Sequence, residues 1–132
     1  MARLFTPLPA AGDIVWCRFP ESIGVPGPKP RPALVLATAQ TGHAVIVVYG
    51  TSQKTQNIYP TEFVLDPGDP GFAVSGLSLR TKFDMAHQIR LSFDSDWFTA
   101  APGLSANLPL PKMGVLHPGY VRMAREAASK RK

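Results

Sequence analysis

The sequence has a single cysteine, Cys17, among its 132 residues. One thiol cannot form an intramolecular disulfide, and it cannot supply a cysteine cluster for zinc. Because Cys17 lies in an apolar stretch, we interpret it as a buried structural thiol rather than a nucleophile. The chain also lacks an apolar run of roughly 18 residues and a signal-peptide core. We therefore expect a cytoplasmic protein without a membrane contact.

Several motifs of well-known chemistry are missing as well. The chain has no glycine-rich phosphate loop ending in Gly-Lys-Ser/Thr, no GxGxxG, no HExxH and no GxSxG. Nucleotide hydrolysis, dinucleotide redox chemistry, zinc proteolysis and an α/β-hydrolase triad thus lose their sequence support. The histidines, at positions 43, 87 and 117, are too far apart for paired metal ligands. We expect neither a metal nor another cofactor.

Charged residues are few, at 17%, and the net charge is +5. Residues 1–111 carry equal numbers of basic and acidic side chains, so the excess positive charge lies in residues 112–132. The basic composition therefore describes the C-terminal segment and is weak support for a polyanionic partner.

What the chain does contain is 14 prolines, 11 glycines and 45% hydrophobic residues. This composition favours many short strands joined by turns over a helical bundle. Apolar and β-branched runs predict strands at 13–19, 33–39, 43–49, 59–65, 76–81, 86–93 and 112–116. From Pro118 to about Lys130 the spacing predicts an amphipathic helix, with His117 as its cap. We predict one mainly β domain over residues 1–132: an N-terminal extension at 1–11, a small SH3-like barrel at about 12–116 and a C-terminal α-helix at about 118–130.

Polar residues at the ends of the apolar strands are the candidate site. Arg31 directly precedes a buried run, and its forked guanidinium suits a phosphate. Thr51, Ser52, Gln53 and Lys54 follow the strand that ends near residue 50, and they offer hydroxyls, backbone N–H groups and one ammonium. An ordinary polar turn is the alternative interpretation of Thr51 and Ser52.

Five segments occur in a fixed order along the chain: Gly12-Asp-Ile-Val-Trp16, Arg31-Pro-Ala-Leu-Val35, Val47-Val-Tyr-Gly-Thr-Ser52, Gln88-Ile-Arg90 and Gly114-Val-Leu116. This succession, from Gly12 to about Arg125, resembles the MazF/PemK family of toxin ribonucleases. The resemblance implies an SH3-like barrel that forms a homodimer in the cytoplasm of a bacterium, encoded there or by a phage or plasmid. It implies metal-independent cleavage of single-stranded RNA and neutralisation by a cognate antitoxin protein.

The resemblance also implies roles for individual residues. Arg31 falls where the family has a catalytic arginine, and Thr51 and Ser52 fall where it has hydroxyl residues that contact the scissile phosphate. The chain departs from the family at two positions. It has His87 where members commonly carry a catalytic Asp, and Met85 where some have a catalytic Arg.

The chemistry of RNA cleavage gives these residues a role without the family. Attack by the 2′-OH needs a base, an acid and positive charge on the phosphorane. His87 can exchange protons near neutral pH, since an unperturbed imidazole titrates near about pH 6.5. Gln53, Lys54 and Lys82 are candidate RNA-binding residues. Asp84 is the alternative base, and a hydrogen-bonded strand histidine is the structural alternative for His87.

The remaining alternatives concern the aromatic residues and the function itself. Trp16, Phe19, Phe63 and Phe83 lie in predicted strands and are expected in the core, whereas Tyr49 and Tyr59 are less clearly internal. Trp97 and Phe98, in an acidic loop, are candidate contacts for a dimer partner or an antitoxin. The alternative function is a catalytically inactive barrel that binds RNA or a protein. A third hypothesis is an adaptor whose basic helix binds an acidic peptide.

Overall fold

The computed structural model describes residues 2–20, 24–100 and 110–131. Its elements run in the order β1 (Asp13–Cys17), β2 (Arg31–Ala39), β3 (Ala44–Thr51), β4 (Glu62–Leu65), η1 (Ala73–Ser75), β5 (Thr81–Asp84), β6 (Ile89–Ser92), β7 (Lys112–Val115), η2 (Pro118–Tyr120) and α1 (Val121–Ser129). None of the helices in these residues is long and apolar enough to cross a membrane.

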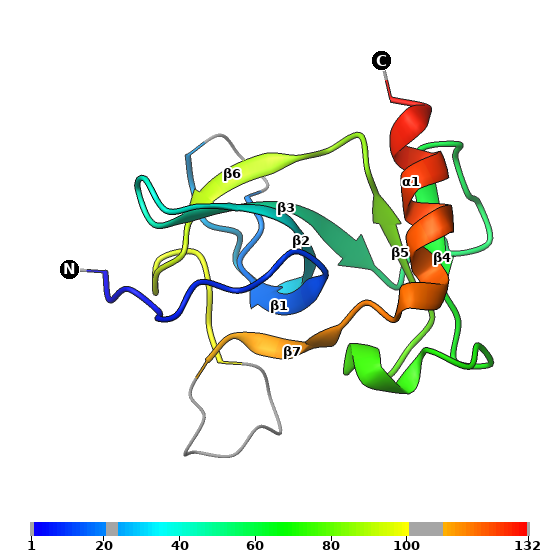
Figure 1. Ribbon diagram of the computed structural model, residues 1–132, viewed down its shortest axis with the longest axis horizontal. Helices are drawn as coiled ribbons and strands as arrows, with labels where there is room; N and C mark the ends of the chain where they lie inside the picture. The colour runs from blue at the N-terminus through cyan, green and yellow to red at the C-terminus, as the bar shows by residue number, and fades with distance from the viewer. Residues whose placement is uncertain (1, 21–23, 101–109, 132) are drawn as a thin grey trace.

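The strands form one antiparallel sheet in the order β4-β5-β3-β2-β1-β7, with β6 also paired to β3. The first half of β3 pairs with β6 and its last two residues pair with β5. One long strand thus serves two partners along the same edge, and the sheet curls into a half-barrel with α1 beside β4 (Figure 1). The predicted mainly β, SH3-like fold with a C-terminal helix is confirmed.

The central hairpin is confirmed as well. β2 and β3 pair from Ala33 opposite Tyr49 to Ala39 opposite Ala44. The turn between them needs left-handed backbone at Gly42, with φ 79°, and at His43, with φ 47°. The His43 ring nitrogen Nε2 lies 2.6 Å from the carbonyl oxygen of Phe5, so this histidine fastens the N-terminal segment to the hairpin.

The strand predicted at 76–81 is wrong, since the strand of this region is β5, at Thr81–Asp84. The short helix η1 ends at Gly76 in a left-handed conformation with φ 75°. A Cβ at Gly76 would lie 2.2 Å from the carbonyl oxygen of Met113, so the chain crosses β7 closely here. Because of this close crossing, residues 76–80 form no strand pairs, and strand pairing begins at Thr81.

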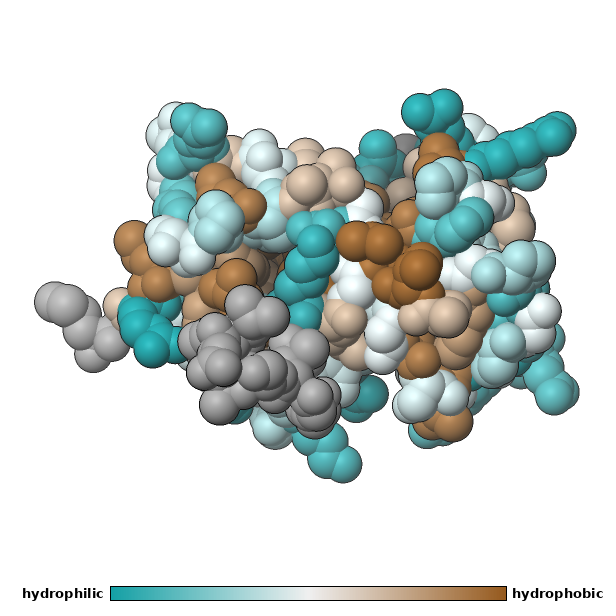
Figure 2. Space-filling model, turned by 60° about the horizontal axis from the view of Figure 1, so that its bottom comes forward, coloured by the Kyte–Doolittle hydropathy of each residue, from teal (hydrophilic) through white to brown (hydrophobic). Residues whose placement is uncertain are grey.

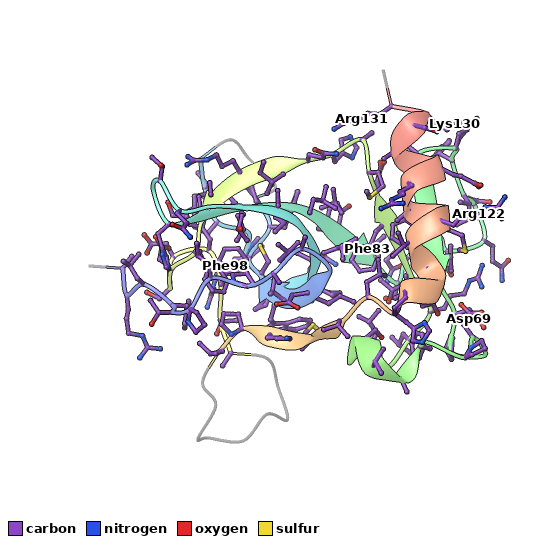
Figure 3. All side chains as sticks on the ribbon, in the orientation of Figure 1. Asp69, Phe83, Phe98, Arg122, Lys130 and Arg131 are labelled. Atoms are coloured by element: carbon purple, nitrogen blue, oxygen red, sulfur yellow. The ribbon has the colours of Figure 1, made fainter. Side chains whose placement is uncertain are left out.

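Two clusters of buried side chains form the core, and Figure 3 marks one phenylalanine of each. Phe83 belongs to the cluster beneath α1, together with Met85 and Tyr120. Phe98 belongs to the second cluster, with Phe5 from the N-terminal segment. Because Phe98 is only 1% exposed, its predicted role as a partner contact is wrong; the isolated bridge between Cys17 and Phe98 draws it inside.

Cys17 has no exposed surface, which confirms the structural thiol, and burial raises the pKa of this thiol well above its usual range.

The C-terminal helix begins as predicted. The His117 Nδ1 accepts a hydrogen bond from the Gly119 amide at 2.9 Å, and η2 continues directly into α1. Ala124 and Ala127 are buried against the barrel, while basic side chains project from the helix into solvent (Figure 3). The hydroxyl of Tyr120 donates to Asp69 at 2.8 Å and ties the start of the helix to the turn after β4.

Candidate active site

Three of the predicted site residues, Arg31, Thr51 and Ser52, line one hollow of about 530 Å³. Arg31 is the first residue of β2 and Thr51 is the last residue of β3. The hollow continues to η1 and β7, where Leu77 and Met113 form part of its wall. On the face of the molecule drawn in Figure 2, hydrophobic residues gather between hydrophilic ones. The first hollow, as we call it, therefore combines an apolar wall with one guanidinium and two hydroxyls.

The strand register brings these polar groups into one row. Ala33 lies opposite Tyr49, and continuing this antiparallel pairing by two residues brings Arg31 opposite Thr51. On the other side of β3, Thr51 lies opposite Lys82 of β5. Side chains directly opposite one another on neighbouring strands point to the same face. Thr51 therefore stands between a guanidinium and an ammonium.

The Thr51 hydroxyl is prepared for an acceptor. Its Oγ1 accepts a hydrogen bond from the Gln53 amide at 3.0 Å, which forms the turn after β3. Within the described ranges 2–20, 24–100 and 110–131, no hydrogen bond donated by this hydroxyl is found. A hydroxyl that accepts one bond still has its own O–H to donate, and a phosphate oxygen is an acceptor. The polar turn and the phosphate contact are thus compatible roles of the same residue.

The other predicted residues line a second hollow of about 320 Å³. Its lining includes the predicted site residues Gln53, Lys54, Lys82, Asp84 and His87, together with Thr51. Since Thr51 lines both hollows, they meet at this residue. The structure thus brings all the predicted site residues to two neighbouring hollows rather than to one.

The two candidate bases of the sequence form a pair. The His87 Nδ1 lies 3.1 Å from the Asp84 Oδ2, and the side chains are 70% and 19% exposed respectively. The other carboxylate oxygen, Oδ1, accepts hydrogen bonds from the Thr61 hydroxyl at 2.8 Å and the Ala86 amide at 2.9 Å. Asp84 is therefore held by its neighbours, and in turn it orients the imidazole. Because Nδ1 faces Asp84, Nε2 is the nitrogen left for a substrate.

Lys82 has a different environment from the one expected of an RNA contact. Its Nζ lies 3.1 Å from the Glu62 Oε2 and donates to the Asn57 carbonyl at 3.0 Å, and both charged side chains are only 8% exposed. A buried ammonium needs such partners. Its positive charge is balanced within the chain, so Lys54, an exposed residue in the left-handed region with φ 54°, is the freer cation of the second hollow.

Sequence reasoning missed part of the lining. Trp16, expected in the core, is only half-buried and lines the first hollow with Leu77 and Leu79. β1 is apolar on both faces, so its residue pattern gives no signal for which face opens on a hollow. Met85 is buried beneath α1 and lines neither hollow. In the described part of the chain no cluster of three or more His, Cys, Asp or Glu residues could hold a metal ion.

Comparison with known proteins identifies the family. Residues 10–91 match the family of PemK-like, MazF-like toxins of type II toxin–antitoxin systems. The chain belongs to this toxin family. The match covers β1 to β5 and all but the last residue of β6, and it includes every lining residue of the two hollows except Met113.

Solved structures agree with this toxin fold. One is an endoribonuclease from mycobacterial species, with TM-score 0.57 and 15% identity over 96% of this chain and 92% of the other. Another is an endoribonuclease in complex with its cognate antitoxin, also from mycobacterial species, with TM-score 0.56 and 14% identity over 92% of each chain. None of the curated proteins is similar enough to count as a match.

Proposed function

We propose that this member of the toxin family is an endoribonuclease that cleaves single-stranded RNA by metal-independent transesterification. The observation that carries the proposal is the pairing of His87 with Asp84 in a hollow that meets the Arg31 hollow at Thr51. The similarity of the fold to two mycobacterial endoribonucleases also supports it.

In this mechanism the scissile phosphate lies at Thr51. The Thr51 and Ser52 hydroxyls orient the phosphate, and the Arg31 guanidinium balances the negative charge of the phosphorane. The Nε2 of His87 takes the proton of the 2′-OH as the 2′-oxygen forms its bond to phosphorus. The bond from phosphorus to the 5′-oxygen then breaks on the opposite side of the phosphorus. That oxygen takes a proton from a solvent water, and the imidazole returns its own proton to the solvent. The products are a 2′,3′-cyclic phosphate and a 5′-hydroxyl.

The test is incubation of the purified protein with a long single-stranded RNA in EDTA. We expect the wild type to leave 2′,3′-cyclic phosphate ends. Arg31→Ala should reduce the cleavage rate by about 10² to 10³-fold because it removes charge from the phosphorane site. His87→Ala should reduce it by about 10² to 10⁴-fold because it removes the proton carrier. Arg125→Ala, an exposed arginine of α1, is the matched control and should cleave like the wild type.

The possible results separate the alternatives. Cleavage that survives His87→Ala but is lost in Asp84→Ala would move the base to Asp84. Folded wild-type protein that cleaves no RNA would contradict the enzyme. RNA or protein binding without cleavage would then favour the alternative function, a catalytically inactive barrel that acts as a binding module.

We also propose a cytoplasmic homodimer that a cognate antitoxin neutralises. The support is that a solved structure of similar fold is an endoribonuclease in complex with its cognate antitoxin. Light scattering should give twice the mass of one chain, and co-expression with a protein encoded beside this chain should suppress cleavage. A monomer, or cleavage that no neighbouring gene product suppresses, would contradict the respective part of this proposal.

A further inference from the structure

The second hollow contains an aromatic ring that the proposed mechanism does not use. Tyr59 lies in the connection before β4, and 69% of its surface is exposed. It lines the same hollow as Thr51, His87 and Lys54. An exposed aromatic ring beside a phosphate site and a cation is the arrangement with which proteins bind single-stranded nucleic acids.

The backbone of Tyr59 is held in place, and a cation lies near its ring. The Tyr59 amide donates to the Glu62 Oε1 at 2.8 Å, and the Tyr59 carbonyl accepts from the Glu62 amide at 2.9 Å. The same carboxylate binds the Lys82 Nζ, which lies 5.9 Å from the centre of the Tyr59 ring. The buried ion pair thus connects the backbone of Tyr59 with a cation on its ring. Because its backbone is already ordered, this residue has only side-chain freedom left to lose when a ligand stacks on the ring.

We propose that the Tyr59 ring is a stacking platform for a nucleobase of the single-stranded RNA whose phosphate lies at Thr51. This inference rests on the proposed function, because it places the RNA backbone at the meeting point of the two hollows. Lys82 and Glu62 are then positioning residues: they orient Tyr59 and do not touch the RNA. Stacking tolerates any base, since every base has a π-face, and purines should bind more tightly than pyrimidines because their faces are larger.

The experiment measures binding without cleavage. The probes are fluorescent homopolymeric 2′-O-methyl oligonucleotides, which lack the attacking hydroxyl, and binding to the dimeric or monomeric protein as purified is followed by anisotropy. Tyr59→Leu removes the π-face and should weaken binding about tenfold. Tyr59→Phe keeps the ring and should bind within about twofold of the wild type. Ile58→Ala, whose side chain lines a different groove beside α1, is the control for loosening of this segment.

Placing one abasic residue at successive positions of the oligonucleotide locates the stacked base. In the wild type, removing the base at one position should weaken binding about tenfold. In Tyr59→Leu, removing the base at the same position should weaken binding no further. Equal binding by wild type and Tyr59→Leu overturns the platform, and so does equal loss in Tyr59→Leu and Tyr59→Phe. If the wild type cleaves RNA in either case, the proposed function stands. A folded wild type that neither binds nor cleaves RNA overturns both the stacking platform and the proposed function. If Tyr59→Leu weakens only the binding of a protein partner, the ring belongs to a protein interface instead.

Discussion

At the scale of single residues, His87 and Asp84 form a pair, with the His87 Nδ1 3.1 Å from the Asp84 Oδ2. In the proposed mechanism the Asp84 carboxylate stabilises the charged imidazole that forms when Nε2 takes a proton. Asp84→Asn keeps the shape but removes this charge, so we expect kcat to fall at least about tenfold with little change in KM. A fluorogenic RNA gives both constants, and thermal melting checks that the bonds to Thr61 and Ala86 survive. A rise in KM alone would show that Asp84 serves binding rather than proton transfer.

The backbone of Lys54 is left-handed, with φ 54°. A substitution at this position should therefore affect protein stability and RNA binding differently. A glycine adopts this conformation without the steric penalty of a Cβ, so Lys54→Gly should be as stable as the wild type or up to about 1 kcal/mol more stable. The same change removes an ammonium from the second hollow, and the salt dependence of RNA binding should become shallower by about 0.7 in log–log slope. Lys54→Ala is the matched control, since it also loses the charge but keeps the strained backbone. An unchanged slope in both variants would exclude Lys54 as a phosphate contact.

At the scale of elements, the absence of a side chain at Gly50 allows β3 to pack closely against β5. A Cβ at this position would lie 2.7 Å from the Phe83 Cε1 and 2.8 Å from the Thr81 Cγ2. Gly50→Ala must therefore push buried groups apart, and we expect a loss of about 1 to 3 kcal/mol in the free energy of unfolding. Cleavage should fall too, because Gly50 directly precedes Thr51. Gly68→Ala, in an exposed turn where the nearest atom is a side-chain oxygen at 3.1 Å, is the control in urea unfolding. Equal stability of the two variants would contradict this tight packing.

The elements also show what the sequence could and could not predict. Long apolar runs predicted the β2–β3 hairpin, and the polar residues at their ends led to Arg31 and Thr51. The strand predicted at residues 76–81 was wrong because the conformation of this segment depends on its close contact with β7, nearly forty residues later in the chain. The same holds for single side chains: Lys82 is buried because Glu62 meets it across the β4–β5 pair, and Phe98 is buried because it bridges to β1. Local patterns thus locate strand ends and their polar groups, whereas burial of a given side chain depends on partners that the local pattern does not name.

For the whole molecule, the free energy of unfolding at alkaline pH depends on one buried titratable group in each core cluster. Cys17 is buried in one cluster and Tyr120 in the other. Burial raises the pKa of both groups above the usual range, and the hydrogen bond to Asp69 adds to the shift at Tyr120. The folded protein therefore keeps both protons where the unfolded chain releases them, at about pH 8.5 for a thiol and about pH 10 for a phenol. Stability is fully present below these values, and it falls as the pH rises from them toward the raised pKa values of the folded protein.

We therefore expect the free energy of unfolding to fall above about pH 8.5 and more steeply above about pH 10, by up to about 1.4 kcal/mol per pH unit for each group. Urea unfolding at neutral pH, about pH 9 and about pH 10.5 measures this slope. Cys17→Ala should flatten the first part of the curve and Tyr120→Phe the second, whatever each substitution costs at neutral pH through lost packing or the lost bond to Asp69. Because the two groups lie in different clusters, the double variant should show the sum of both changes in slope. If both single variants keep the wild-type slope, the alkaline loss of stability arises from groups outside the two clusters.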